Sequence, residues 1–238
     1  RLRTYDIETS DCIKSFFHDD VINDIAVNGT GPYMVLSVSD DKYASMWDLR
    51  MKESTCELKF PYQLTCCALS NDARTAFISG IDQTIYSFDT RTSKPLFAMQ
   101  GHSNIVTGIA LSHDETQLVS NAMDQSLLLW DAKLLTSKAT PTNNNASGSV
   151  RCTGKYYGHV HHQQSYQLLR CSFNKDDSKL TAGSSDSFVN VWDKITYRML
   201  YKLPGHRGSV NEVVFHPLEP IIASCSNDNT VLVGELVL

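Results

Sequence analysis

Long apolar segments are absent from this 238-residue chain. It contains no run of 18 apolar residues, and its first ten residues, RLRTYDIETS, include no apolar signal region. A membrane-spanning helix needs about 20 such residues, and a secretion signal needs an apolar core. We therefore expect an intracellular, soluble protein with no membrane partner.

An excess of basic residues is also missing. Lys and Arg total 21 against 26 Asp and Glu, which gives a formal net charge of −5. Direct nucleic-acid binders usually present a basic face. We expect no direct sequence-specific nucleic-acid binding, although a local basic patch remains an open alternative.

Metal-binding spacings are equally scarce. The seven cysteines form no C-x-x-C pair, and most lie in apolar segments such as LTCCALS at 64–70, so we expect small buried side chains in a reducing compartment. His159, His161 and His162 have no Cys or acidic neighbours, which favours a solvated loop over a metal site. No metal or cofactor is predicted.

Signatures of catalysis do not occur either. The chain has no phosphate-binding glycine loop, no G-x-S-x-G elbow and no isolated carboxylate pair. The sequence therefore predicts a protein that is not an enzyme and has no small-molecule substrate.

What the chain does contain is a repeat. A Trp-Asp type dipeptide recurs at intervals of 42, 41, 42, 62 and 42 residues, at Tyr5-Asp6, Trp47-Asp48, Phe88-Asp89, Trp130-Asp131, Trp192-Asp193 and Gly234-Glu235. A period of about 40–45 residues is typical of four-stranded propeller blades. We predict an all-β propeller in which each repeat forms a small antiparallel sheet, with repeats at about 12–48, 54–89, 94–131, 151–193 and 198–235.

A second mark has a fixed offset from the dipeptide. An Asp lies six residues before the Trp-like position in each repeat, and short apolar runs flank it, as in QLVSNAMDQSLLLWD at 117–131. Runs of this length around a polar turn indicate adjacent antiparallel strands. These aspartates are Asp41, Asp82, Asp124, Asp186 and Asp228.

A third mark is Gly-His, at Gly101-His102, Gly158-His159 and Gly205-His206, with a lone His18 in the first repeat. Together the three marks resemble the WD-repeat family. The resemblance implies a structural tetrad in which His bonds Asp and Ser reaches the Trp indole. The members are His18, Ser37, Asp41 and Trp47; His102, Ser120, Asp124 and Trp130; Asp186 and Trp192, with Ala182 where Ser is expected; and His206, Ser224 and Asp228, with Gly234 in place of Trp.

The second repeat lacks most of this set, with Phe88 for Trp and no Gly-His near Pro61. We expect the second and fourth repeats to depend more on apolar packing. A Ser-His-Asp hydrolase is the alternative interpretation of these residues. Repetition at strand ends argues against it, because a nucleophile needs one exposed site.

The 62-residue interval contains TSKATPTNNNASGSV at 136–150, for which we predict a mobile loop. Residues 1–6 match only the last strand of a repeat. The WD-repeat resemblance implies a ring that has seven blades when complete, so we expect an N-terminally incomplete propeller of about five repeats plus part of another.

Details beyond the repeat narrow the resemblance. Three segments closely resemble the WD-repeat subunits of the U5 small nuclear ribonucleoprotein: LVSNAMDQSLLLWD at 118–131, LLRCSF at 168–173 and YKLPGHRGSVNEVVFHPLEPIIASCSND at 201–228. This implies a nuclear scaffold in pre-mRNA splicing that docks on pre-mRNA-processing factor 8 and other U5 proteins.

A rival interpretation is a substrate receptor of a cullin ubiquitin ligase. Its feature is WDLR at 47–50, because Arg50 offers a planar fork to a carboxylate or carbonyl of an adaptor. Arg91 follows Phe88-Asp89 at the same spacing and weakens the signal. Arg50, Tyr43 and Phe188 are candidate partner-binding residues, although Tyr43 and Phe188 suit packing as well as binding.

Overall fold

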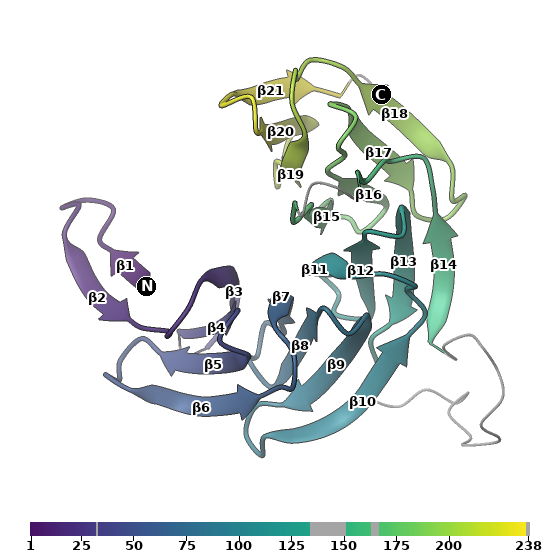
Figure 1. The fold of residues 1–238 in the computed structure, drawn as a ribbon. Coiled ribbons are helices and arrows are strands. Elements are labelled where there is room, and N and C mark those ends of the chain that lie inside the picture. Colours follow the sequence, from purple (N-terminus) through teal and green to yellow (C-terminus); the bar gives the residue numbers. More distant parts are fainter. Residues whose placement is uncertain (32, 134–150, 163–166, 237–238) are drawn as a thin grey trace, which may run out of the picture. The chain divides into compact units, whose positions relative to one another are not determined.

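The computed structural model describes residues 1–31, 33–133, 151–162 and 167–236 (Figure 1). It divides into two compact units, Arg1–Ala98 and Met99–Leu238. Every regular element in the described residues is a β-strand, which confirms the all-β prediction. None of these residues form a helix that could cross a membrane. The loop predicted at 136–150 lies outside the described residues.

The first unit contains a two-stranded sheet, β1-β2, and two four-stranded sheets, β3-β4-β5-β6 and β10-β9-β8-β7. Neighbouring strands whose register is resolved are antiparallel. The strands are β1 (Leu2–Tyr5), β2 (Cys12–Phe16), β3 (Ile22–Val27), β4 (Met34–Ser39), β5 (Tyr43–Asp48), β6 (Ser54–Lys59), β7 (Leu64–Leu69), β8 (Thr75–Gly80), β9 (Thr84–Asp89) and β10 (Lys94–Gln100), whose last two residues belong to the second unit.

The second unit contains the sheets β11-β12-β13-β14, β15-β16-β17-β18 and β19-β20-β21. Within it, β11 contacts β15 and β15 contacts β19, so the first strands of successive sheets pack together (Figure 1). The strands are β11 (Val106–Leu111), β12 (Gln117–Ala122), β13 (Ser126–Asp131), β14 (Cys152–Tyr156), β15 (Cys171–Phe173), β16 (Lys179–Ala182), β17 (Val189–Asp193), β18 (Met199–Leu203), β19 (Val210–Phe215), β20 (Ile221–Ser226) and β21 (Val231–Glu235).

Sheets and repeats are offset by one strand, which differs from the expectation that each repeat forms its own sheet. The repeat at 12–48 contributes β3, β4 and β5 to one sheet, and the fourth strand of that sheet, β6, belongs to the repeat at 54–89. The same offset brings β14 and β18 into the sheets that precede their own repeats. Each repeat is thereby hydrogen-bonded to the repeat before it.

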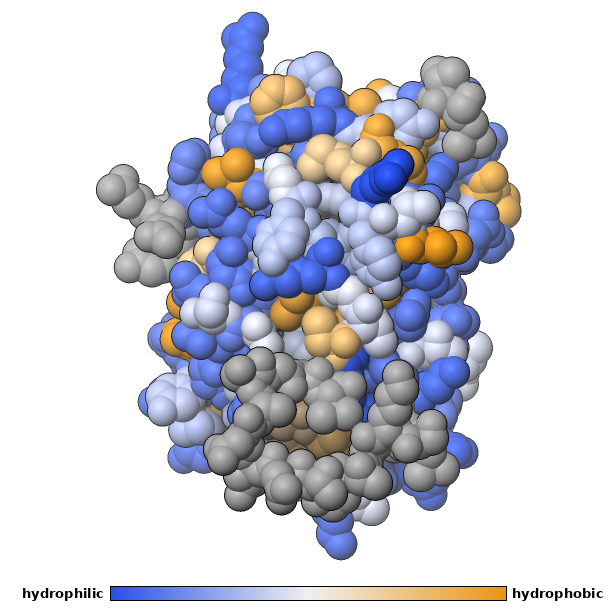
Figure 2. Space-filling model, turned by 90° about the vertical axis from the view of Figure 1, so that its right-hand side faces the viewer, coloured by the Kyte–Doolittle hydropathy of each residue, from blue (hydrophilic) through white to orange (hydrophobic). Residues whose placement is uncertain are grey.

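Burial explains why these segments form strands. The central strands β4, β5, β12 and β13 are almost continuously buried, because the sheets are covered on both faces. The outer strand β6 alternates between half-buried and exposed positions, as expected for a strand with one solvated face. On the face drawn in Figure 2, hydrophilic residues predominate and hydrophobic ones form small separate groups. The described residues on that face form no broad apolar surface.

A shared turn explains the five aspartates. The residue after each of them has a left-handed backbone conformation, with φ between 62° and 72° at Lys42, Gln83, Gln125, Ser187 and Asn229. In four of these turns the Asp carboxylate accepts the N–H of the residue two positions later, as from Tyr43 to Asp41 at 2.9 Å. Asp suits this position because its side chain stabilises such turns locally. The repeated Asp therefore fixes the hairpin between two strands.

Candidate functional site

The third repeat holds one complete hydrogen-bonded tetrad. His102 lies before β11, and its Nδ1 is 3.0 Å from Asp124 Oδ2, while its Nε2 is 2.6 Å from Ser120 Oγ. The Trp130 indole N–H donates to the same Ser120 oxygen at 2.8 Å. A carboxylate only accepts, so a proton sits on His102 Nδ1 and is donated to Asp124. The chain of donors therefore runs from Trp130 through Ser120 and His102 to Asp124 without an unpaired group.

The first repeat has the same geometry. His18 Nδ1 is 2.8 Å from Asp41 Oδ2, and both His18 Nε2 and Trp47 Nε1 lie 2.7 Å from Ser37 Oγ. Partial burial by itself raises the pKa of Asp41, but hydrogen bonds from the Tyr43 N–H and His18 outweigh it and hold the pKa below its usual range. The carboxylate is thus kept ionised as an acceptor.

The fifth repeat forms the same network without Trp. His206 Nδ1 is 3.1 Å from Asp228 Oδ2, and Nε2 is 2.9 Å from Ser224 Oγ. Thr230 adds a hydroxyl 3.2 Å from the same Nδ1 and donates to Asp228, which lowers the pKa of that carboxyl. Thr230 is a member of this network that the sequence pattern did not single out.

The fourth repeat departs from the tetrad, and the grouping of Asp186 with Trp192 is wrong. Asp186 accepts from Ser184 Oγ at 2.5 Å and pairs with Lys202 Nζ at 2.7 Å, whereas the Trp192 indole donates to the Tyr157 carbonyl at 3.0 Å. The physical reason is Ala182. Without a hydroxyl at this position on β16, nothing joins the indole to the Asp, and each finds a separate partner.

The histidine of this repeat, His159, has a different hydrogen-bond partner from the tetrad histidines. His159 Nε2 lies 2.9 Å from Asn121 Oδ1 on β12, and the Asn121 amide N–H in turn donates to Leu169 O at 3.1 Å. Because the amide oxygen accepts, the His159 proton is on Nε2, which leaves the buried Nδ1 without a partner among the described residues. His159 therefore ties the segment after β14 to strand β12 of the preceding repeat.

The solvated loop expected for the histidine cluster is wrong for two of its three members. His159 and His161 are 2% and 1% exposed, and only His162 is exposed. His161 Nε2 lies 3.1 Å from the Gln167 carbonyl. Burial lowers the pKa of His159 to about 4 and also lowers the pKa of His161.

This shift predicts that the protein begins to lose stability below pH 6.5, before most carboxylates titrate. A histidine with a folded pKa of about 4 and an unfolded pKa of 6.5 binds more protons when unfolded. Its contribution to stability is therefore complete above pH 6.5 and is lost as the pH falls toward 4. At about 1.4 kcal/mol per pH unit, the free energy of unfolding should fall by about 2–3 kcal/mol between pH 7 and pH 4.5. Urea titrations at both pH values measure it.

The variant His159→Gln, which keeps an N–H donor toward Asn121, should lose most of this pH dependence. His113→Gln is the matched control, because the His113 side chain is 57% exposed. Equal pH dependence in wild type and His159→Gln would show that His159 is not held neutral by burial.

The second repeat replaces the tetrad by aromatic packing. Phe60 lies 5.5 Å from Phe88 and 5.8 Å from Tyr86 between ring centroids. The Tyr86 hydroxyl donates to Asp82 at 2.7 Å, so the repeat Asp keeps one side-chain partner. Phe60 stands next to Pro61, where the third, fourth and fifth repeats carry Gly-His and the first carries a lone His18, and fills that site with apolar surface.

Arg50 is the first of the three candidate partner-binding residues. Its Nη2 and Nε donate to Asp48 at 2.7 and 3.0 Å, and these bonds hold the pKa of Asp48 to about 2. The Arg50 side chain is 68% exposed, but one edge of its fork already binds a carboxylate of this chain. An Asp48 oxygen also accepts the backbone N–H of Arg50, two residues later, and Asp89, Asp131 and Asp193 accept the equivalent N–H in their repeats.

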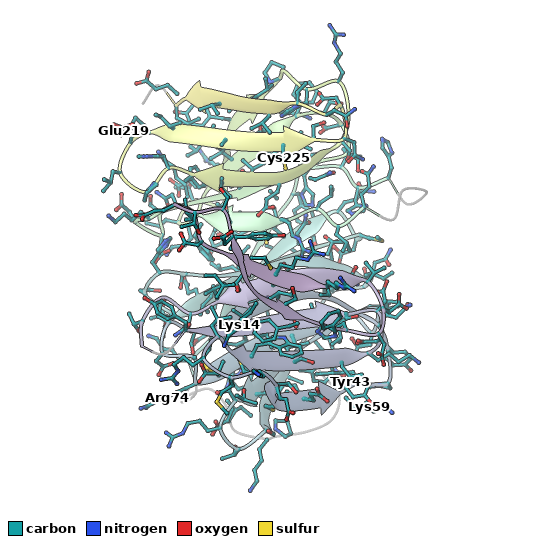
Figure 3. The ribbon with its side chains drawn as sticks, turned by 90° about the vertical axis from the view of Figure 1, so that its left-hand side faces the viewer. Lys14, Tyr43, Lys59, Arg74, Glu219 and Cys225 are labelled. Carbon is teal, nitrogen blue, oxygen red and sulfur yellow. The ribbon has the colours of Figure 1, made fainter. Side chains whose placement is uncertain are left out.

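Tyr43 and Phe188 share a different arrangement. The Lys59 ammonium lies 5.4 Å from the centroid of the Tyr43 ring, and the Lys202 ammonium lies 4.7 Å from that of Phe188. Figure 3 shows Tyr43 and Lys59 together at one end of the first unit's sheets. Both rings are half-buried and have an intramolecular cation as a neighbour.

The chemistry of the tetrads is structural. Ser37 and Ser120 are 0% exposed, and their oxygens are engaged by His and Trp, so neither hydroxyl can reach a substrate. Among the described residues, no group of three His, Cys, Asp or Glu side chains could hold a metal ion. The cysteines are buried at Cys66, Cys67 and Cys171, but Cys12 and Cys152 are exposed and Cys56 and Cys225 are intermediate, so the expectation of general burial holds only in part.

Comparisons with known proteins agree with this architecture. The family model described as WD domain, G-beta repeat matches residues 10–48, 93–131, 150–193 and 197–233. The U5 small nuclear ribonucleoprotein 40 kDa protein of Homo sapiens is 38% identical over 97% of this chain and 62% of its own length. The pre-mRNA-splicing factor cwf17 of Schizosaccharomyces pombe is 36% identical over 92% of the chain and 61% of its own.

The U5 40 kDa protein of Dictyostelium discoideum is 36% identical over 92% of this chain and 59% of its own length. The chain therefore spans about three fifths of the length of these relatives. The matched repeats, the staggered antiparallel sheets and the His-Ser-Asp-Trp networks together show that this chain belongs to the WD40 repeat family.

Proposed function

We propose that this chain is a non-catalytic protein-interaction scaffold of the U5 small nuclear ribonucleoprotein, acts in pre-mRNA splicing in the nucleus, and docks on pre-mRNA-processing factor 8. The observation that carries the proposal is the similarity to U5 40 kDa proteins along 97% of the chain. A relative named as a pre-mRNA-splicing factor points to the same process.

The described structure suits a scaffold. Buried His-Ser-Asp networks and tight hairpin turns hold the strand ends, so the exposed loops present fixed surfaces to partners. The net charge of −5 favours protein partners over phosphate backbones within a ribonucleoprotein. Non-obligate protein interfaces are about as polar as the rest of a protein surface, and the mainly hydrophilic face in Figure 2 is compatible with such an interface.

Affinity purification from nuclear extract, with sequencing of the associated RNA, tests the proposal. We expect enrichment of U5 RNA together with the largest U5 protein. Recovery of cullin components without RNA would instead favour the ubiquitin-ligase receptor. Recovery of neither U5 RNA nor cullin components would contradict the proposal.

Arg50→Ala separates the two candidates further. Exposed ion pairs contribute little to stability, so we expect an unchanged urea midpoint for unfolding. We also expect unchanged recovery of U5 RNA, because Arg50 already binds Asp48. Arg198→Ala, at another exposed arginine, is the control. Loss of a cullin adaptor in the Arg50 variant alone would support the rival function.

A further inference from the structure

One end of the first unit contains a hollow of about 410 Å³ that is open to solvent. Its floor consists of Met34, Met46, Cys56 and Ala73, which belong to, or pack on, the apolar core between the β3–β6 and β7–β10 sheets. The core therefore reaches the surface at this point. Methionine side chains adapt their shape to an inserted group, which suits them to line a binding pocket.

Two arginines stand on the rim of this hollow. Arg74 follows the turn between β7 and β8, and Arg91 follows β9; both are exposed. Arg74 lies at the end of the sheets opposite to Tyr43 and Lys59 (Figure 3). The rim thus presents two cationic planar groups beside an apolar floor.

The backbone below both arginines is fixed. Ala73 has a positive φ of 57°, and its carbonyl accepts the Thr90 hydroxyl at 2.6 Å. The Thr90 N–H donates to the Arg74 carbonyl at 3.0 Å, which ties the two segments together. Binding would therefore order little beyond the side chains themselves.

The acids next to the arginines are largely occupied. The Asp72 carboxylate accepts from Ser70 Oγ at 2.7 Å and from the Arg74 N–H at 3.0 Å, and lies 3.5 Å from the guanidinium. Asp89 accepts the Arg91 N–H at 2.9 Å. Because these carboxylates are bound by Ser70 Oγ and by backbone N–H groups, the outer edges of both guanidinium groups remain available for a carboxylate of another molecule.

We propose that this hollow, with floor Met34, Met46, Cys56 and Ala73 and rim Arg74 and Arg91, is a docking pocket for a partner-protein segment in which a large apolar side chain stands between acidic residues. The apolar side chain occupies the methionine floor and the carboxylates bind the arginines. The inference rests on the proposed role as a protein-interaction scaffold, but it does not require that the protein be part of the U5 small nuclear ribonucleoprotein.

Methyl NMR of the full-length protein with isotope-labelled methionine tests this directly, because Met34 and Met46 report from the floor. Three short peptides serve as probes: a leucine flanked by glutamates, a leucine flanked by lysines, and a serine flanked by glutamates. We expect saturable shifts of both methyl signals with the first peptide and binding at least tenfold weaker with the other two. The methyl signals of Met123 and Met199 should not move.

The double charge reversal Arg74→Glu and Arg91→Glu should weaken binding of the first peptide at least tenfold. The matched control, Arg198→Glu with Arg207→Glu, changes two exposed arginines of the second unit and should bind as wild type does. An unperturbed methyl spectrum of the free variant establishes that it is folded. No saturable shift, or equal binding of the lysine peptide, overturns the proposal, while recovery of U5 RNA by the wild type tests the proposed function separately.

Discussion

Replacing Ser120 by alanine should lower the free energy of unfolding by about 2–4 kcal/mol. Its hydroxyl oxygen accepts the Trp130 indole N–H and lies 2.6 Å from His102 Nε2, and the residue is fully buried. Removing it leaves two buried polar groups without a partner, and each such loss costs about 1–3 kcal/mol. Urea unfolding followed by fluorescence measures the change.

Ser87→Ala is the matched control. Ser87 is also fully buried in a central strand, β9, but its hydroxyl has no hydrogen-bond partner among the described residues. Removing an unpaired buried hydroxyl should be neutral or slightly stabilising. If Ser120→Ala and Ser87→Ala change stability equally, the tetrad does not have the energetic role assigned to it.

Trp130→Ala should be the most damaging single substitution considered, lowering the free energy of unfolding by about 3–5 kcal/mol. The ring is 0% exposed and packs so closely on Gly101 that a Cβ there would lie 2.9 Å from Trp130 Cη2. Truncation therefore leaves a large cavity in addition to the lost hydrogen bond to Ser120.

Trp130→Phe separates these two effects. It retains most of the apolar volume and loses the indole N–H, so it should cost about 1–2 kcal/mol. Phe88 occupies the equivalent position of the second repeat, which shows that the fold accommodates phenylalanine there. Chemical unfolding of both variants measures the difference, and a Phe variant as unstable as the Ala variant would contradict the assignment of most of the cost to packing.

The regular parts of the fold could be predicted because one residue type has one physical role in every repeat. Each repeat Asp precedes a left-handed residue, and such a turn fixes where two strands meet. Ser120 and Trp130 lie on the paired strands β12 and β13, and His102 reaches Ser120 from the segment just before β11, the strand on the other side of β12. A fixed spacing on paired strands therefore encodes a fixed contact.

The irregular parts could not be predicted because they depend on contacts between repeats. His159 bonds Asn121, which lies 38 residues earlier in the preceding repeat, and no spacing in the sequence marks that pair. The burial of His161 was missed because its partner, the Gln167 carbonyl, is a backbone group that no residue type in the sequence marks. In the second repeat, the loss of Gly-His was visible, but the Phe60, Tyr86 and Phe88 cluster that replaces it follows only from the sheet geometry.

The one-strand offset between repeats and sheets was also not predicted. The spacing of the Trp-Asp pairs gives the length of a repeat, but it does not show which strands of neighbouring repeats pair with each other. Hydrogen bonds between β5 and β6, and between β13 and β14, place that boundary inside a sheet. This pairing ties each repeat to the one before it.

Direct binding of the purified protein to purified, nuclease-treated pre-mRNA-processing factor 8 tests the central claim of a protein-docking scaffold. Size-exclusion chromatography with light scattering should show a stable complex of the two proteins without RNA, and the Arg50→Ala variant should form it equally well. Separate elution of the two proteins, or a complex that forms only when U5 RNA is added, would contradict the account.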